Sequence, residues 1–299
     1  MTREEFLNKK YSEYFNSHFW AHQKFFESPA SGNCEPFKIS DNIYYVGDKY
    51  VCIHMIDTGD GLVLIDSGYF NCEHILIDSI YKLGFNPRDV KWIIHSHAHY
   101  DHFGASSEFK KMYGTRLAIS RVDFESVKEK PHRAHIDNTK FPYARIPEFD
   151  KTLEDGEVFE LGNMKMRCVL TPGHTDGVMS FFWNTTWQGE EYVAATFGGA
   201  GVGAVTLPHL CYNERPYDTP QTMLRAIDSV IEEKVDFHLG NHPGNNNTFG
   251  RYEKMKKEGG NPFLNPLGWK TFLLELKKSV DEKIEENKAL EDEMKKLGL

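Results

Sequence analysis

Short apolar runs separated by Gly and Asp turns predict strands in the first part of the chain, and runs with apolar residues three or four apart predict helices. The two kinds of segment alternate up to about residue 130, and residues 157–196 are rich in predicted strands. This order is typical of a mixed α and β protein. The predicted strands are 43–46, 51–57, 62–66, 91–95, 116–119 and 236–239, and the predicted helices are 72–83, 103–113, 121–130 and 219–234.

The two ends of the chain predict added helices. Residues 4–26 carry aromatic side chains three or four apart, which favours an amphipathic helix that covers the core, or else forms a wall of a pocket or a dimer contact. Residues 267–299 predict one long helix with a heptad-like apolar seam, which either docks on its own domain or joins two subunits. We therefore expect a helical segment with a linker over 1–36, a main domain over 37–260 and a C-terminal helix over 261–299.

Four side chains that can bind metals lie within six residues, directly after the apolar run that ends at Ile94. The stretch reads His97-Ala98-His99-Tyr100-Asp101-His102. In an extended backbone the first two histidines project to the same side, so both can bind one ion. The Asp and the last His follow where the chain bends, and they can turn toward a second ion. Imidazole and carboxylate ligands suit zinc and other first-row metals, so the stretch predicts a metal site.

Two later turns each supply one more histidine. His174 lies in Thr171-Pro172-Gly173-His174-Thr175-Asp176-Gly177, after an alternating run, and His242 lies in Leu239-Gly240-Asn241-His242-Pro243-Gly244, after another. Either histidine alone is ordinary for a turn. Together with the first stretch they complete two sets of three metal-binding side chains.

The pattern H-x-H-x-D-H, then G-H-T in a turn and a late His-Pro-Gly, resembles the metallo-β-lactamase superfamily from about Ile39 to about Tyr252. The spacing is most similar to the third β-lactamase subclass and its relatives, which are His-rich and have no bridging Asp or Cys. The resemblance implies an α/β fold, a four-layer αβ/βα sandwich with metals at the seam between two sheets. It implies one ion on His97, His99 and His174 and a second on Asp101, His102 and His242.

The resemblance also implies a function. We expect a hydrolase with two zinc ions, in which a hydroxide between the ions cleaves an amide, lactam, lactone or ester bond of a small molecule. Asp101 would also orient the hydroxide, and Asp66 would be the buried carboxylate behind the ligands. Iron or manganese could take the place of zinc. The alternatives are an iron-dependent oxidoreductase on the same fold, and a non-β-lactam hydrolase such as a lactonase or thioesterase.

The chain departs from the superfamily at the end of the predicted strand 191–196. Many hydrolases of the superfamily carry a bridging Asp there, where this chain has Ala195 and Thr196. The third β-lactamase subclass places a serine in this region, so Thr196 fits that branch, but Gly198 stands where its second hydroxyl would be. This argues against β-lactam hydrolysis. Substrate contacts are expected from the loops over 131–150 and 197–220, with Tyr143, His135, Arg145, Tyr212 and Asn213 as candidates.

The composition disfavours other classes of protein. The 299 residues carry a formal net charge of -9, which argues against a surface that binds nucleic acid phosphates. The N-terminus has no apolar run of the kind found in signal peptides, and no run approaches the roughly 18 residues of a membrane span. The 5 cysteines are scattered, without a C-x-x-C pair. We therefore expect a cytoplasmic protein that acts on a small molecule, with no nucleic acid or membrane partner, and that can form a homo-oligomer through its C-terminal helix.

Overall fold

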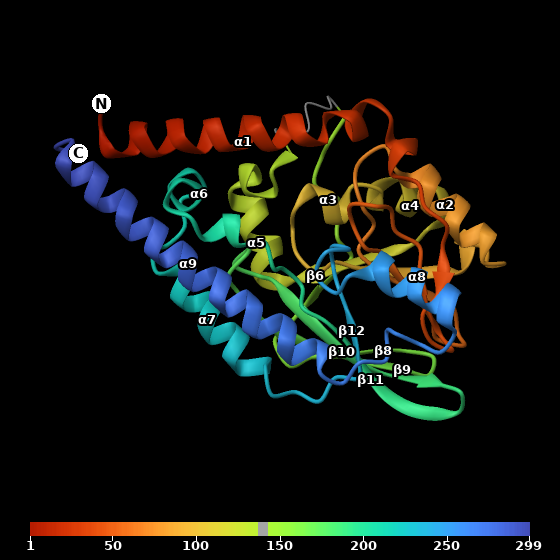
Figure 1. Ribbon diagram of the computed structural model, residues 1–299. Helices are drawn as coiled ribbons and strands as arrows, with labels where there is room; N and C mark the ends of the chain where they lie inside the picture. Colours follow the sequence, from red (N-terminus) through yellow and green to blue (C-terminus); the bar gives the residue numbers. More distant parts are fainter. Residues whose placement is uncertain (137–142) are drawn as a thin grey trace.

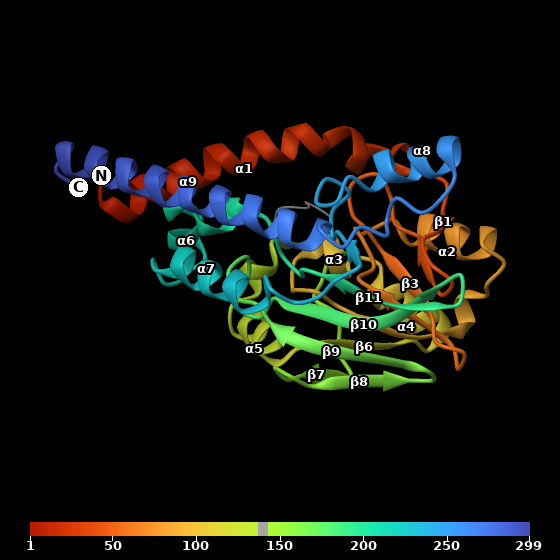
Figure 2. The same ribbon diagram turned by 60° about the horizontal axis from the view of Figure 1, so that its bottom comes forward.

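The computed structural model describes residues 1–136 and 143–299, and the side chains of Phe15 and of residues 17–27 lie outside this description. Two β-sheets lie against each other in the middle of the molecule, and helices cover the outer face of each sheet (Figures 1 and 2). This is the four-layer αβ/βα sandwich that the sequence predicts, so the predicted fold is confirmed. In the described part of the chain, no helix is both long and apolar enough to cross a membrane.

The first sheet has the strand order β1 to β7, in the order of the chain. The strands from β1 to β4 pair antiparallel, and those from β4 to β7 pair parallel. Parallel neighbours need crossover connections, which the helices between them supply. The strands are Phe37–Lys38, Ile43–Tyr45, His54–Asp57, Leu62–Ile65, Val90–Ile94, Arg116–Ser120 and Lys151–Leu153, and the helices between β4 and β7 are α2 (Glu73–Lys82), α3 (Tyr100–Phe103), α4 (Ser106–Tyr113) and α5 (Arg121–Glu129).

The second sheet has the order β12-β11-β10-β9-β8. Side chains on its strands alternate between two cores, as the pleat requires. Phe181 faces the core between the sheets, and Phe182 faces the core under the outer helices. The strands are β8 (Val158–Leu161), β9 (Met164–Leu170), β10 (Met179–Trp187), β11 (Glu190–Thr196) and β12 (Phe237–Leu239), and the helices on the outer face are α7 (Thr219–Val230) and α9 (Gly268–Lys296).

The N-terminal helix α1 (Arg3–Glu27) packs across α6 (Leu207–Tyr212). Phe6 and Leu7 are buried in a cluster with Leu207 and Met294. An ion pair from Arg3 to Glu291 links α1 to α9, so the two ends of the chain lie side by side (Figures 1 and 2). The predicted helix at this end is present, and its aromatic positions Phe15, Phe19, Trp20, Phe25 and Phe26 lie outside the described side chains.

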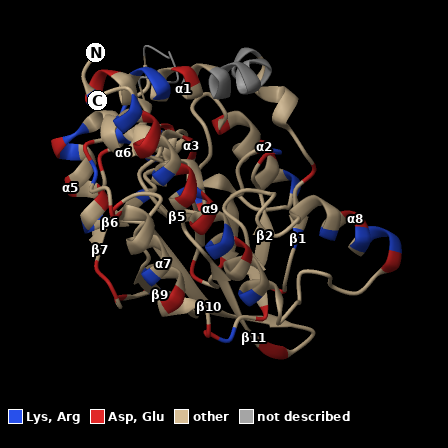
Figure 3. Ribbon diagram, turned by 60° about the vertical axis from the view of Figure 1, so that its left-hand side comes forward, with Lys and Arg blue, Asp and Glu red and all other residues tan. Residues whose placement is uncertain are grey.

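The predicted C-terminal helix is present as α9, and its seam packs on its own chain. Leu273, Leu276 and Val280 are buried against the second sheet and α7. Asn287 accepts a hydrogen bond from the N–H of Leu207 and donates one to the carbonyl of Val205. On the exposed side of α9, Lys288 pairs with Glu285 and Lys295 pairs with Asp292. Basic and acidic residues follow one another along this helix (Figure 3). Docking therefore accounts for the seam, and pairing of two copies through α9 stays a prediction.

Most predicted element boundaries agree with the structure to within a few residues, but β3 begins later than predicted. The carboxylate of Asp48 accepts hydrogen bonds from the backbone N–H groups of Tyr50 and Val51, at 2.7 and 2.8 Å. This holds a turn where the apolar run 51–53 predicts strand. Helix α8 (Thr248–Glu258) and the short α6 were not predicted. The other short turns are η1 (Pro29–Gly32), η2 (Pro87–Asp89), η3 (Pro131–Ala134) and η5 (Val202–Val205).

Candidate metal centre

Asp66 fixes the loop that carries the first metal-binding residues. It follows β4 with φ 65°, a left-handed backbone that is uncommon for a residue other than glycine. Its Oδ1 accepts the N–H of Ser96 at 2.7 Å, and its Oδ2 accepts the Ser96 hydroxyl at 2.8 Å. The same Oδ2 lies 2.7 Å from Nδ1 of His102. The buried carboxylate thus ties both ends of the loop to the end of β4.

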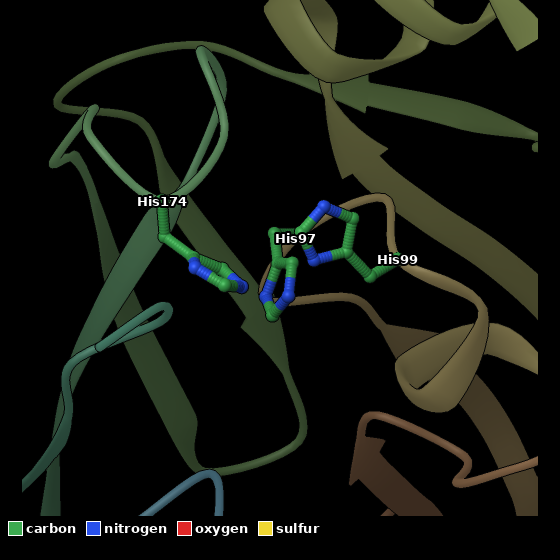
Figure 4. Close-up of side chains that lie close together, drawn as sticks. All are labelled: His97, His99 and His174. Carbon is green, nitrogen blue, oxygen red and sulfur yellow. The ribbon is translucent and has the colours of Figure 1, made fainter. Parts of the chain in front are cut away.

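The first predicted triad, His97, His99 and His174, converges in the structure (Figure 4). Each side chain offers one nitrogen, and these three atoms lie within 4.8 Å of one another. Nδ1 of His97 donates to the carbonyl of Gly198 at 2.8 Å, and Nδ1 of His174 donates to that of Gly201 at 2.8 Å. These bonds fix the tautomer, so Nε2 of each ring keeps its lone pair.

The second predicted triad, Asp101, His102 and His242, also comes together within 4.8 Å. Nδ1 of His102 is held by Asp66, and Nδ1 of His242 donates to the carbonyl of Tyr50 at 2.7 Å. Their Nε2 atoms lie 3.3 and 3.5 Å from Oδ2 of Asp101. Here too the outer nitrogen is occupied by the protein and the inner one faces the shared centre.

Burial controls the ionisation of the first triad. Loss of hydration lowers the pKa of His97 and His99 well below the usual value for histidine, and lowers the pKa of His174 to about 3. The three imidazoles are therefore neutral near pH 7. Neutral imidazole is the form that binds a cation through its lone pair.

The second triad is controlled by its carboxylates. Burial raises the pKa of Asp101, but the positive charge of His102 outweighs this and holds the pKa well below its usual range. Burial lowers the pKa of His102, but Asp101 and then Asp66 outweigh it and raise this pKa to about 10. The carboxylates of Asp66 and Asp101 therefore create a strongly negative electrostatic potential around His102. A positive charge belongs there, and either a proton on the imidazole or a metal cation supplies it.

The donor set fits a pair of cations. Nε2 of His97 is buried and has no hydrogen-bond partner among the described residues, and Nε2 of His102 faces Oδ2 of Asp101 at 3.3 Å. A buried polar atom without a partner is costly, and a bound metal removes this cost. The two rings lie 4.1 Å apart between centroids, so the triads adjoin. Neutral imidazoles with one carboxylate suit zinc and related first-row metals.

Asp123 in α5 connects two of the ligand loops, and the sequence analysis missed it. It is buried, and its Oδ2 accepts the N–H of Ala98 and the hydroxyl of Thr175, both at 2.8 Å. Its Oδ1 accepts the N–H of Gly177 at 2.8 Å. A Cβ on Gly177 would lie 2.3 Å from the backbone nitrogen of Asp123, so only glycine fits there. One carboxylate therefore sets the spacing between the first histidines and His174.

Arg215 binds the turn that carries His174 through hydrogen bonds, and the sequence did not predict this role either. Its Nη1 donates to the carbonyl of His174 at 2.9 Å, and its Nη2 donates to that of Gly173 at 2.8 Å. Its Nε donates to Asp176 at 2.9 Å. The planar guanidinium makes all three contacts at once. No local pattern in the sequence points to either residue, because each acts from a distant element.

A cavity of about 310 Å³ lies over both triads. Residues of each triad form its floor, and tyrosines from four separate segments form much of its wall. His135 lines it, with its ring centroid 4.6 Å from that of His99 and its Nε2 3.3 Å from Nε2 of His209. The described lining residues are Tyr14, Tyr50, Tyr69, His99, Tyr100, Asp101, His135, His174, Gly201, Gly203, Ala204, His209 and His242.

The structure places four of the five substrate-contact candidates away from this cavity. Tyr143 and Arg145 line a separate cavity of about 250 Å³, together with residues of α2 and α4. Tyr212 stacks on Tyr11 with ring centroids 4.0 Å apart. Asn213 is buried behind the metal residues, where its side chain donates to the carbonyl of His209. The role of these four residues as substrate contacts stays a prediction, and the loop positions 137–142 lie outside the described residues.

The second departure noted in the sequence has a steric reason. A Cβ on Gly198 would lie 2.1 Å from the carbonyl oxygen of Met179, so no hydroxyl side chain fits at this place. The Gly198 carbonyl instead accepts from His97 and from the amide of Asn241. Thr196 ends β11 and is buried, and its hydroxyl has no partner among the described residues. Its part in the site stays a prediction.

Residues 46–185 match the metallo-beta-lactamase superfamily. A probable metallo-hydrolase of Burkholderia pseudomallei is 28% identical over 151 residues, 40% of this chain and 46% of that protein. The hydroxyacylglutathione hydrolase GloC of Haemophilus influenzae is 28% identical over 200 residues, 64% of this chain and 82% of that one. The crystal structure of BJP-1, a subclass B3 metallo-beta-lactamase of Bradyrhizobium japonicum, is 26% identical, with a TM-score of 0.76 over 88% of this chain and 98% of that one.

Over residues 46–185 the chain is therefore similar to the metallo-β-lactamase superfamily, and the two metal-binding triads lie on a fold similar to that of a solved member. Within that superfamily it is similar in fold to the subclass B3 enzyme BJP-1, as the spacing of the histidines predicts. The chain spans less than half the length of the first curated relatives that it matches, at 46%, 32% and 33%. The matched residues 46–185 include His174 but end before His242.

Proposed function

We propose that the protein is a hydrolase with two metal ions, most suitably zinc, that cleaves an amide, lactam, lactone or ester bond of a small molecule. His97, His99 and His174 would hold one ion, and Asp101, His102 and His242 the other. The observation that carries the proposal is the pair of adjoining triads, each with its ligand atoms within 4.8 Å, below one cavity. Relatives named as metallo-hydrolase and hydroxyacylglutathione hydrolase support the reaction class.

Bound cations supply two effects at such a site: they lower the pKa of water and polarise a carbonyl group. The protein's own groups do the rest. Asp66, Asp123 and Arg215 hold the ligand loops in place before substrate arrives, so little reorganisation remains during the reaction. Asp101 is ionised and can accept a hydrogen bond from the attacking water, which orients it.

His135 and His209 form the polar wall of the cavity beside His99. Both are buried, and their Nε2 atoms lie 3.3 Å apart. Nδ1 of His135 lies 3.3 Å from the hydroxyl of Tyr11, so the wall is held from α1 as well. We assign this pair the positioning of a substrate oxygen by hydrogen bonding. His135 lines the cavity, which supports its predicted role as a substrate contact.

The proposal includes a cytoplasmic location and a small-molecule substrate. All five cysteines are unpaired, which supports a reducing compartment, since thiols there are kept from forming disulfides. Recovery of the native protein in cytosolic or exported fractions tests the location. Whether copies associate through α9 is tested by sedimentation, and the docked seam favours a monomer.

The test of the reaction is hydrolysis of a panel containing a chromogenic cephalosporin, aliphatic and aromatic lactones, and aryl esters. We expect turnover that a strong chelator abolishes and added zinc restores. His97→Ala should remove it, and His74→Ala is the matched control because His74 is exposed on α2. Full turnover by His97→Ala, or turnover insensitive to the chelator, contradicts the proposal. If the purified protein contains iron, transfers electrons and hydrolyses none of these compounds, the result favours the oxidoreductase alternative.

A further inference from the structure

A second cavity, of about 470 Å³, lies between the two helices that extend the superfamily core. Its walls come from α1, from η5 with the start of α6, and from residues 283–290 of α9, all outside the matched residues 46–185. We call it the helix groove. The described residues that line it are Lys10, Tyr11, Tyr14, Val202, Gly203, Thr206, Pro208, Lys283, Glu286, Asn287 and Leu290.

The helix groove adjoins the cavity over the metal triads. Tyr14 and Gly203 line both cavities. Gly203 has no side chain, and the Tyr14 hydroxyl oxygen lies 3.0 Å from the point where a Cβ would stand. The boundary at this place is therefore one tyrosine side chain against bare backbone. A molecule that extends past this boundary reaches from the metal centre into the groove.

The chemistry of the groove is that of a neutral apolar chain. Val202, Pro208 and Leu290 are partly exposed and offer apolar surface. The two lysines have internal partners, since Lys283 pairs with Glu286 at 2.7 Å and the ammonium of Lys10 lies 5.4 Å from the ring centroid of Phe6. Lysines held in this way present their methylene stems to a ligand.

We propose that the helix groove binds the apolar tail of an elongated, neutral substrate whose scissile bond lies over the metal triads. The inference rests on the proposed hydrolase function and names its substrate class. It also gives α1 and α9, which lie outside the matched residues 46–185, a role in the binding site.

The probe is a series of straight-chain alkyl hydroxamates with two to twelve carbons, which bind zinc through the head group and differ only in the tail. Binding to the zinc-loaded full-length protein is measured by titration calorimetry, so the readout does not depend on turnover. Once the alkyl chain passes Tyr14, we expect Kd to fall about two- to four-fold for each added methylene. The lower factor corresponds to a partly buried methylene group and the higher factor to a fully buried one.

Lys283→Trp should fill the helix groove with an indole ring. Lys278→Trp is the matched control, since Lys278 lies on the same helix, with 81% of its side chain exposed against 27% for Lys283. In Lys278→Trp we expect Kd to fall with the length of the alkyl chain, as in the native protein. In Lys283→Trp we expect Kd to be independent of chain length. Both variants should bind the two-carbon probe with the native Kd. Gly203→Leu is a second block, placed at the boundary, where the backbone is outside the left-handed region.

The outcomes separate the two proposals. If the two-carbon hydroxamate does not bind the zinc-loaded protein, the metal centre and the hydrolase proposal fail. If it binds but longer chains gain nothing, or if folded Lys283→Trp and Gly203→Leu keep the native dependence, the helix groove is not a tail site and this inference is overturned.

Discussion

Replacing Asp123 by Asn tests whether one buried carboxylate sets the spacing of the ligand loops. Asn keeps the shape, and its amide oxygen can take the place of Oδ2, which accepts from Ala98 and Thr175. The amide NH₂ then faces the N–H of Gly177, so two donors meet where Oδ1 now accepts at 2.8 Å. The variant thus loses one hydrogen bond and gains a repulsion without changing the volume of the core.

The magnitude follows from the loss of that bond. A hydrogen bond to a charged group contributes about 1.5–3 kcal/mol. Burial raises the pKa of Asp123, so the native carboxylate costs desolvation energy that Asn avoids. We therefore expect the free energy of unfolding to fall by about 2 kcal/mol. For a chain of this size that lowers Tm by roughly 3 °C. Because Asp123 holds the loops of His97 and His174, zinc affinity should fall about ten-fold or more.

Two measurements on Asp123→Asn check this reasoning. Thermal unfolding of the metal-free protein measures the change in Tm, and competition with a chromophoric chelator measures the zinc affinity. Asp60→Asn is the control, because Asp60 is exposed in a turn of the first sheet. A folded Asp123→Asn variant with native zinc affinity would refute the idea that this residue positions the ligands. A native Tm would refute the energetic estimate.

Three further predictions follow from other parts of the structure. Asp66→Asn should weaken zinc binding at the second triad about 10- to 100-fold, because it replaces the acceptor that holds Nδ1 of His102, and zinc titration measures this. Asn287→Leu should lower the free energy of unfolding by about 2–4 kcal/mol, since it leaves a backbone N–H and a carbonyl of the η5–α6 segment without partners, and urea unfolding measures this. Burial raises the pKa of the Cys34 thiol to about 12, so its thiolate is scarce at pH 8 and alkylation by iodoacetamide should be slow there and speed up as pH rises toward that value; rapid alkylation at pH 8 contradicts this.

The sequence predicts most of this fold because its strands end in recognisable turns. The strands before His97, His174 and His242 each run into a polar turn, and that is where the structure gathers the metal-binding side chains. Helix α8 was missed because residues 248–258 are mainly polar, with three apolar side chains, Phe249, Tyr252 and Met255, and because Gly250 lies inside it. The late start of β3 was missed because a side chain, Asp48, takes the backbone N–H groups that a strand would use.

The walls of the site could not be predicted in the same way. Tyr14 reaches the cavity from a helix more than eighty residues before the first metal motif, and its position depends on how α1 packs on α6. Asp123 and Arg215 act through loops that are distant in sequence. The long connection before β7 can border the cavity or leave it, and Tyr143 and Arg145 show that part of it leaves. Local patterns do not contain such long-range choices.

The most direct test of the account is the number of metal ions that one chain binds. Elemental analysis after zinc loading and desalting should give about two zinc ions for the native protein and for His74→Ala, since two triads are present. His174→Ala should keep about one, because only the first triad loses a ligand. Native protein that retains no zinc, or a His174→Ala variant that retains as much as native, contradicts the central claim.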